Sequence, residues 1–221
     1  MGNIDGSVIG QFLLFMVALI FSLSVHESAH AWMSNRFGDD LARLQGRISL
    51  NLAAHVDPIG TLLFPAIAYF TGAPLIGWAK PTPVNPLRWR NKDLANVMVS
   101  IAGILANMRI AIIAFTIFKI WLLMRADQRL AVSTQEPIEL FLTYLLIMNV
   151  SLAVFNLLPF PPLDGSRILD TILPASMRPF LEFLEQYGFL ILIVLMSVGF
   201  FRAIISPVIQ FVFELLLLGV R

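Results

Sequence analysis

The sequence predicts an all-α polytopic membrane protein of about four to six transmembrane helices, with short strand or hairpin elements between some of them. The chain of 221 residues is 58% hydrophobic and only 13% charged, and its mean hydropathy is +0.82. That composition is more apolar than the water-exposed surface of a soluble domain allows. Apolar runs of about 20 residues, the length that crosses a bilayer as a helix, recur along the chain.

The apolar runs that are long enough to span are residues 9–33, 94–124, 138–158 and about 187–219. We expect the last of these to be divided near Arg202 and Pro207, because a proline interrupts a helix. A further apolar piece, residues 59–78, is broken by Pro65, Gly72, Pro74 and Gly77. We expect this piece to re-enter the membrane or to lie beside the helices without crossing.

Three connecting segments have their own patterns. Residues 46–52 alternate between polar and apolar side chains in the manner of a strand, and residues 80–86 are extended because prolines disfavour the helical conformation before them. Residues 159–165 form a proline-rich turn that cannot continue the preceding helix. We therefore expect short strands or a hairpin beside the helices that carry the candidate site.

The chain is predicted to form a single integral membrane domain over residues 1–221, with a core at about 9–170 and further membrane helices at about 187–220. Its 15 basic and 14 acidic residues give no charge argument for binding nucleic acid. Cysteine is absent, which leaves His, Asp and Glu as candidate metal ligands. The first apolar run is not expected to be a cleaved signal peptide, because no basic stretch precedes it.

Three ionisable residues, His26, Glu27 and His30, lie inside the first apolar run. Polar groups are costly there and by default mark a functional site. On a helix, His26 and His30 lie one turn apart on one face, so their imidazoles can share a zinc ion. Glu27 projects roughly 100° around the same turn, in reach of a water beside the metal. The His-Glu-x-x-His pattern is typical of zinc metalloproteases, and we prefer this interpretation to histidines that only bond neighbouring helices.

A catalytic zinc site usually has a third protein ligand. Asp164 is the leading candidate, because it follows a span directly and its proline-rich turn gives rigid support. His55 is an alternative, although its position beside Asp57 and Pro58 favours a role in stabilising a turn.

Several segments together carry a family resemblance: "HESAH", "GRISLN", "HVDPIGT", "GWAKPTPVNP", "AGILAN" and "NLLPFPPLDG". In this order, over residues 26 to about 170, they resemble the site-2 protease family (peptidase family M50), in its compact form without a PDZ or CBS domain. Two positions depart from the family pattern. Ile104 follows Gly103 where relatives have proline, and Leu52 stands where many have proline, which leaves the helix geometry there less certain.

The resemblance implies an intramembrane zinc metalloendopeptidase that cuts within or near transmembrane helices of membrane proteins in regulated intramembrane proteolysis. It implies one Zn²⁺ per chain, held by His26, His30 and Asp164. Glu27 would be the catalytic base, and Asn156 a polar residue near the scissile carbonyl. The implied partners are a transmembrane protein substrate and the lipid bilayer, without nucleic acid. A homodimer is compatible with the sequence.

The positions of the candidate ligands restrict the topology. His26 and His30 lie near the C-terminal end of the first span, and Asp164 lies beyond the C-terminal end of span 138–158, so both spans must run in the same direction. The loops on the site's side contain Arg36, Arg43, Arg47, Lys80, Arg88, Arg90, Lys92, Arg167 and Arg178, against Arg125 and Arg129 on the other. The positive-inside rule then predicts a multi-pass protein, taken to lie in a prokaryotic cell membrane, whose active site faces the cytoplasm.

Two other interpretations compete. Prenyl-processing or heat-shock membrane proteases share the motif, but would take a downstream glutamate as ligand, and Glu136, Glu139, Glu182 and Glu185 lack a supporting motif. A zinc transporter or a non-catalytic metal-stabilised scaffold is the second, but span 94–124 contains no Asp or Glu. Within the protease interpretation, residues 46–52 are a candidate edge strand for an unwound substrate. Asn107 is a weaker candidate for stabilising the oxyanion, because an Asn that faces a neighbouring helix is about as often a structural contact.

Overall fold

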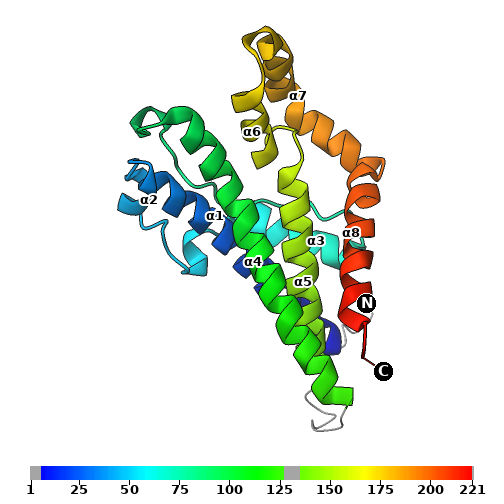
Figure 1. Ribbon diagram of the computed structural model, residues 1–221. Helices are drawn as coiled ribbons and strands as arrows, with labels where there is room; N and C mark the ends of the chain where they lie inside the picture. The colour runs from blue at the N-terminus through cyan, green and yellow to red at the C-terminus, as the bar shows by residue number, and fades with distance from the viewer. Residues whose placement is uncertain (1–5, 127–134, 221) are drawn as a thin grey trace.

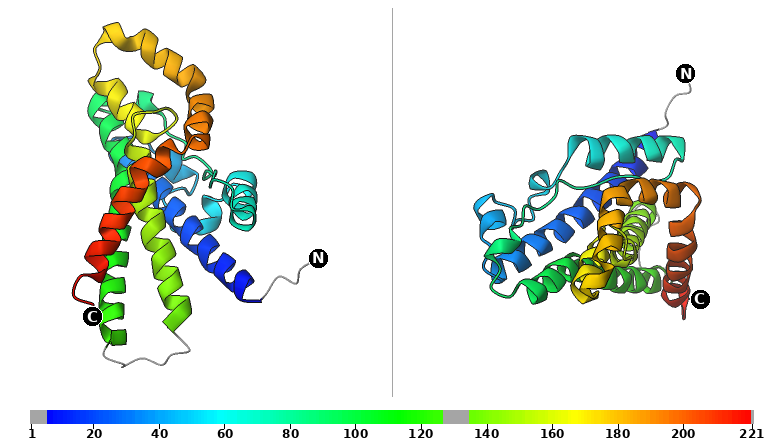
Figure 2. Two further views of the ribbon diagram at one scale, coloured as in Figure 1. Left: turned by 90° about the vertical axis from the view of Figure 1, so that its right-hand side faces the viewer. Right: turned by 90° about the horizontal axis from the view of Figure 1, so that it is seen from above.

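The computed structural model describes residues 6–126 and 135–220 (Figures 1 and 2). The long helices are α1 (Gly6–Arg36), α4 (Lys92–Ala126), α5 (Gln135–Leu157), α7 (Arg178–Ser197) and α8 (Phe200–Leu217). The short ones are α2 (Leu41–Leu44), η1 (Leu52–Ala54), η2 (Pro58–Leu63), α3 (Phe64–Thr71), η3 (Pro86–Arg88), α6 (Asp164–Ile172) and η5 (Ala175–Met177). All five long helices contain an apolar stretch sufficient to cross a membrane. The protein is therefore an integral, multi-pass, all-α membrane protein, as predicted.

Helices α1, α4 and α5 form the centre of the molecule, with α1 and α5 running in one direction and α4 in the other (Figures 1 and 2). Helix α4 packs on both partners because small buried side chains on two of its faces let the backbones approach closely. Ala95 and Ala102 lie on one of these faces, and Ala111 and Ala114 on the other. The arrangement places the C-terminal ends of α1 and α5 at the same end of the molecule, as the candidate ligands require.

Residues 58–71 form the consecutive helices η2 and α3, which together are too short to qualify as a span. Asp57 begins η2 by accepting hydrogen bonds from the backbone N–H groups of Ile59 and Gly60. Helix α3 packs its Tyr69 against Phe15 of α1. The segment therefore does not count among the crossings, as predicted, and α3 lies beside the bundle (Figure 2).

The prediction of short strands or a hairpin is wrong for the described residues, which contain no strand. Residues 46–51 form a turn and bends, because the Ser49 N–H bonds the Ser28 hydroxyl of α1 and not a neighbouring strand. Residues 80–85 are free of helix and strand, and Asn85 is extended, whereas Pro86, the last residue of the segment expected to be extended, begins η3. The backbone of residues 73–85 bonds single groups in several segments. Side-chain partners on α1 thus replace the ladder that the alternation suggested.

The C-terminal apolar run is divided, as expected, but the division lies at Gly199, shortly before Arg202, and not at Pro207. Helix α7 ends at Ser197, and Gly199, with a φ of 77°, starts a bend before α8. A positive φ favours glycine, so the division lies there. Pro207 lies inside α8. Helix α8 continues from α7 toward the end of the bundle away from the site (Figures 1 and 2).

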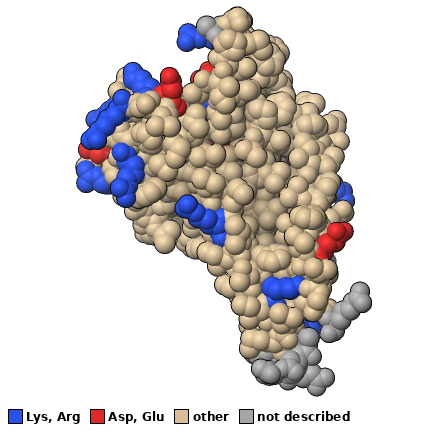
Figure 3. Space-filling model, viewed as in Figure 1, with Lys and Arg blue, Asp and Glu red and all other residues tan. Residues whose placement is uncertain are grey.

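Basic side chains gather at the end of the molecule that contains α2 and the start of α4 (Figure 3). Arg43, Arg88, Arg90 and Lys92 are exposed there. The C-termini of α1 and α5 lie at this same end. The basic residues are therefore concentrated at the end of the molecule that carries the candidate ligands, as the sequence predicted.

Candidate metal centre

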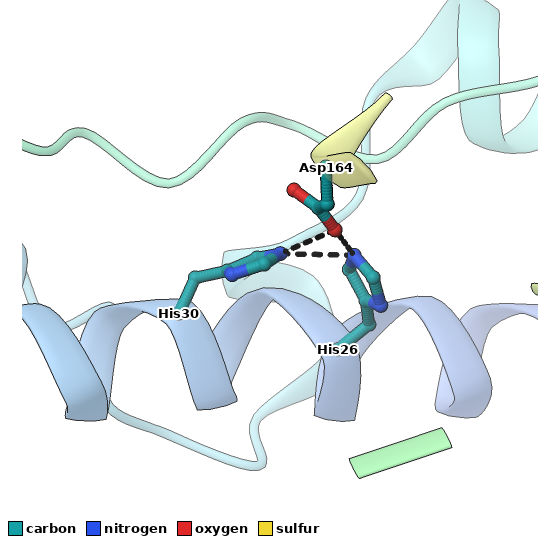
Figure 4. A group of neighbouring side chains, drawn as sticks. All are labelled: His26, His30 and Asp164. Atoms are coloured by element: carbon teal, nitrogen blue, oxygen red, sulfur yellow. Dashed lines mark hydrogen bonds and ion pairs between the residues drawn. The ribbon is translucent and has the colours of Figure 1, made fainter. Parts of the chain in front are cut away.

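Three ligand-type side chains meet where α1 passes the start of α6 (Figure 4). The Nε2 atoms of His26 and His30 are 2.9 Å apart, and Asp164 Oδ2 lies 3.2 Å from each of them. All three residues are buried. Within the described residues, this is the one group of three His, Asp or Glu side chains whose ligand atoms lie within 4.8 Å of one another.

The outer ring nitrogens of the histidines show which atoms face the centre. His30 Nδ1 lies 2.7 Å from the carbonyl oxygen of Val99, and a carbonyl can only accept, so Nδ1 carries the proton. His26 Nδ1 lies 2.6 Å from Asn107 Oδ1 and donates in the same way. In the neutral imidazoles, both Nε2 lone pairs therefore point at the centre.

The residues fit a divalent cation. Two imidazole lone pairs and a carboxylate oxygen converge, and Asp164 Oδ2 is buried without a hydrogen-bond donor. Such a group of acceptors repels itself unless a cation lies between them. Two His and one Asp are ligand types that zinc takes in catalytic sites, with a position left for water.

The position of Asp164 follows from a local chain reversal. Helix α5 ends at Leu157, and the turn of residues 158–163 returns the chain so that Asp164 begins α6. Gly165 permits this, because a Cβ there would lie 2.4 Å from the carbonyl oxygen of Leu157. Helix α7 supports the turn from outside, since a Cβ at Gly188 would lie 2.4 Å from the Pro161 carbonyl oxygen. Two glycines thus allow the close packing that fixes the carboxylate.

Gly103 of α4 faces the two histidines directly. A Cβ at this position would lie 2.6 Å from Cε1 of His26 and 2.6 Å from Nε2 of His30. Any larger residue would push α4 away from the imidazoles. Sequence reasoning treated Gly103 only as part of a family motif and missed this steric role, although a glycine within an apolar span was the available signal.

A buried hydrogen-bond network holds Asn107 in place. Its amide nitrogen donates to Ser22 O and to Asn149 Oδ1, so its own Oδ1 must face His26. Asn149 in turn donates to the Ser22 hydroxyl and to Leu145 O. Side chains from α1, α4 and α5 therefore take part in the network that orients the candidate ligand His26. The geometry gives Asn107 a positioning role beside His26. The sequence suggested an oxyanion donor or a structural contact between helices, but not the bond to His26.

Glu27, the neighbour of His26, contacts the extended segment that follows α3. Its Oε2 accepts a hydrogen bond of 2.8 Å from the Thr82 backbone N–H, and its main-chain carbonyl accepts one of 2.9 Å from the Thr82 hydroxyl. Glu27 is half-buried, so one carboxylate oxygen is fixed while the side chain stays partly accessible.

Comparison with known proteins identifies the family. A family model described as "Peptidase family M50" matches residues 123–199, which include Asp164. A protein of Bacillus subtilis (strain 168), "Putative zinc metalloprotease YwhC", is 38% identical over 180 residues, covering 81% of this chain and 78% of the relative. The chain belongs to peptidase family M50.

Further M50 relatives are more distant. "Putative zinc metalloprotease Rip2" of Mycolicibacterium smegmatis (strain ATCC 700084 / mc(2)155) is 29% identical over 191 residues, covering 86% of this chain and 69% of the relative. The protein of that name from Mycobacterium tuberculosis (strain ATCC 25618 / H37Rv) is 25% identical over 207 residues, covering 93% and 75%. No solved structure gives a significant match to this chain. The expected resemblance to site-2 proteases is confirmed.

Two other candidate residues of this M50 protein lie outside the group of three. Asn156 donates its Nδ2 to Leu152 O in its own helix, at 3.0 Å. His55 is buried and its Nε2 lies 2.9 Å from Ser49 O, so it stabilises the loop before η1. His55 does not join His26, His30 and Asp164, which leaves Asp164 as the third candidate ligand.

Proposed function

We propose that this M50 protein is an intramembrane zinc metalloendopeptidase that hydrolyses peptide bonds within or near transmembrane helices of membrane proteins. One observation carries the proposal: two Nε2 lone pairs and an unpartnered carboxylate oxygen converge inside a membrane-spanning helix bundle, with Glu27 adjoining one of the histidines. His26, His30 and Asp164 would hold one Zn²⁺.

The ion, when bound, supplies Lewis-acid chemistry that acidifies a water molecule and polarises the peptide carbonyl. Glu27 accepts a proton from that water as the water oxygen attacks the carbonyl carbon. Glu27 then delivers the proton to the amide nitrogen as the carbon–nitrogen bond breaks. Two observations support this role: the Thr82 N–H fixes one Glu27 oxygen, and the carboxylate is half-buried, so a second oxygen remains for the proton.

Asn156 is proposed to donate to the developing oxyanion, as the resemblance implies. It lies in the last turns of α5, and Asp164 follows that helix by one short turn. Its Nδ2 carries two hydrogens, so the bond to Leu152 O leaves one of them for the substrate. Asn107 is not proposed for it, because its amide group is fully engaged.

The site is proposed to face the cytoplasm of a prokaryotic cell. Basic residues gather at the site's end of the bundle, and the similar proteins come from bacteria. Cysteines introduced at Lys92 and at Arg125 test this orientation with a membrane-impermeant reagent. We expect Lys92 to be protected in intact cells and Arg125 to be labelled. The reverse pattern contradicts the orientation.

The function is tested with purified protein and a transmembrane reporter substrate. Glu27→Gln should keep zinc and lose turnover, whereas Asp164→Ala should lose both. Asp170→Ala, an exposed carboxylate in the same helix, is the matched control and should keep both. Full reporter cleavage by Glu27→Gln would refute the proposed proton transfer by Glu27. A wild-type protein that binds zinc but does not cleave the reporter would refute the protease function and favour a transport or scaffold role for the metal.

A further inference from the structure

Arg47 is a buried cation that the proposed mechanism does not use. Only 4% of the residue is exposed, and it lies in the loop between α2 and η1. Its Nη1 donates to Ala54 O, and its Nη2 donates to Lys80 O and, at 2.9 Å, to Pro81 O. One guanidinium therefore bonds two segments that are distant in the sequence, one at Ala54 and the other at Lys80 and Pro81.

The carbonyls that Arg47 holds come directly before Thr82. Thr82 is the residue that binds Glu27, through its N–H to Oε2 and through its hydroxyl to the main-chain carbonyl. Proline occupies both neighbouring positions, 81 and 83, and restricts the backbone there. Fixing the Lys80 and Pro81 carbonyls consequently fixes the direction of the Thr82 N–H.

The loop that carries Arg47 is itself attached to α1. The Ser28 hydroxyl donates to Ser49 O at 3.0 Å, and the Ser49 N–H lies 3.1 Å from the same hydroxyl. Ser28 is the residue after Glu27. The contacts therefore form a closed ring from α1 through Ser49 and Arg47 to Thr82, and from Thr82 back to Glu27.

We propose that Arg47 is a positioning residue that acts through Thr82 to hold the Glu27 carboxylate in its productive orientation. The inference rests on the proposed function, in which Glu27 transfers the proton. Arg47 does not touch the reacting atoms. Its planar fork of donors reaches carbonyls in both segments at once, a geometry that a lysine ammonium cannot reproduce.

The first test measures zinc content, kcat and KM of the full-length Arg47→Ala protein with the transmembrane reporter. We expect wild-type zinc content, an unchanged KM and a kcat lower by about 100-fold, since a misplacement of about 1 Å costs on that order. Arg47→Lys keeps the charge but not the fork, and should recover only a small part of kcat. Arg43→Ala removes a neighbouring exposed arginine and is the matched control.

The second test is a double-mutant cycle that combines Arg47→Ala with Thr82→Pro. The Thr82→Pro substitution deletes the backbone N–H of residue 82, whereas Thr82→Val deletes only the side-chain hydroxyl. If Arg47 acts through the Thr82 N–H, Arg47→Ala should cause no further loss of kcat in the Thr82→Pro protein. Additive losses would contradict the coupling. Wild-type kcat in Arg47→Ala or Arg47→Lys would overturn the inference, as would loss of zinc in both.

The two proposals fail in different ways. If the wild-type protein showed no zinc-dependent cleavage, the proposed function would fail, and if Glu27→Gln kept full cleavage, the proposed proton transfer by Glu27 would fail. If both behaved as expected and Arg47→Ala cleaved normally, only the role of Arg47 would be refuted.

Discussion

The Nδ1–H of His26 on α1 donates to the Oδ1 of Asn107 on α4 across 2.6 Å, and this bond decides which nitrogen His26 presents to the candidate metal centre. Asn107 cannot rotate its amide without losing its bonds to Ser22 O and Asn149 Oδ1. The orientation of a ligand is therefore set by packing among three helices. In metal sites, partners of this kind tune the affinity for the ion.

Replacing Asn107 with leucine should weaken zinc binding by about 10- to 100-fold while the protein remains helical, because His26 loses the acceptor that fixes its tautomer. Competition with a zinc chelator measures the affinity, and circular dichroism measures the helicity. Thr116→Val changes a hydroxyl on the exposed face of the same helix and should leave the affinity unchanged. Wild-type affinity in the leucine variant would show that the bond does not tune the site.

Gly103→Ala should abolish zinc binding or reduce it severely. The added Cβ would lie 2.6 Å from Cε1 of His26 and from Nε2 of His30, so α4 or the imidazoles must move. Zinc analysis of the purified variant is the measurement. The control is Gly10→Ala on α1, where a Cβ meets nothing within 4 Å. Normal zinc content in Gly103→Ala would mean that the imidazoles are placed differently around the ion.

Removing zinc should lower the thermal stability of the protein as well as its activity. An ion present at about 1,000 times its Kd stabilises the folded state by about 4 kcal/mol. A chelator should therefore lower the Tm of the wild type and of Glu27→Gln, and added zinc should restore it. His30→Ala should show no chelator-dependent change in Tm. An equal change in His30→Ala would place the stabilising metal elsewhere.

Lys119→Met should destabilise the protein by about 1 kcal/mol, with zinc affinity unchanged. The Lys119 ammonium on α4 donates to the carbonyl oxygens of Leu215, Leu216 and Leu218 at the C-terminal end of α8. A cation at a helix C-terminus interacts favourably with the dipole and the free carbonyls. Thermal unfolding checks the effect, and Lys92→Met, an exposed lysine at the start of α4, is the control. Equal Tm values for both variants would argue against this cap.

More of the candidate metal site than of the surrounding loops could be predicted from the sequence. The four-residue spacing of His26 and His30 fixes their common face on any helix, and their apolar surroundings made a structural role costly. Asp164 was predicted as a ligand from the family resemblance and the rigidity of its turn. Sequence spacing could not relate it to His30, because the two residues are 134 positions apart in the chain. The roles of Gly103, Asn107 and Thr82 were not found, because each depends on what lies opposite in space.

The alternation in residues 46–52 led to the wrong local structure for a physical reason. Alternating polarity shows that one side of an extended segment is buried, but not what that side bonds. Here the Ser28 hydroxyl and the His55 ring bond Ser49, so the segment is held by side chains. Pro207 does not divide the C-terminal run, because it is accommodated within α8 and the chain bends at Gly199.

The sequence by itself determined that the chain is a helical membrane protein, that two imidazoles share one helix face, and that the spans carrying the ligands run in the same direction. The first two follow from composition and helical periodicity, which are local properties, and the third follows once the family resemblance and the rigid turn give Asp164 as a ligand. Only the tertiary structure decided which nitrogens face the centre, how closely α4 approaches it, and that Thr82 holds Glu27. Each of these depends on hydrogen bonds or contacts between segments that are remote in the chain, and no local pattern specifies such partners.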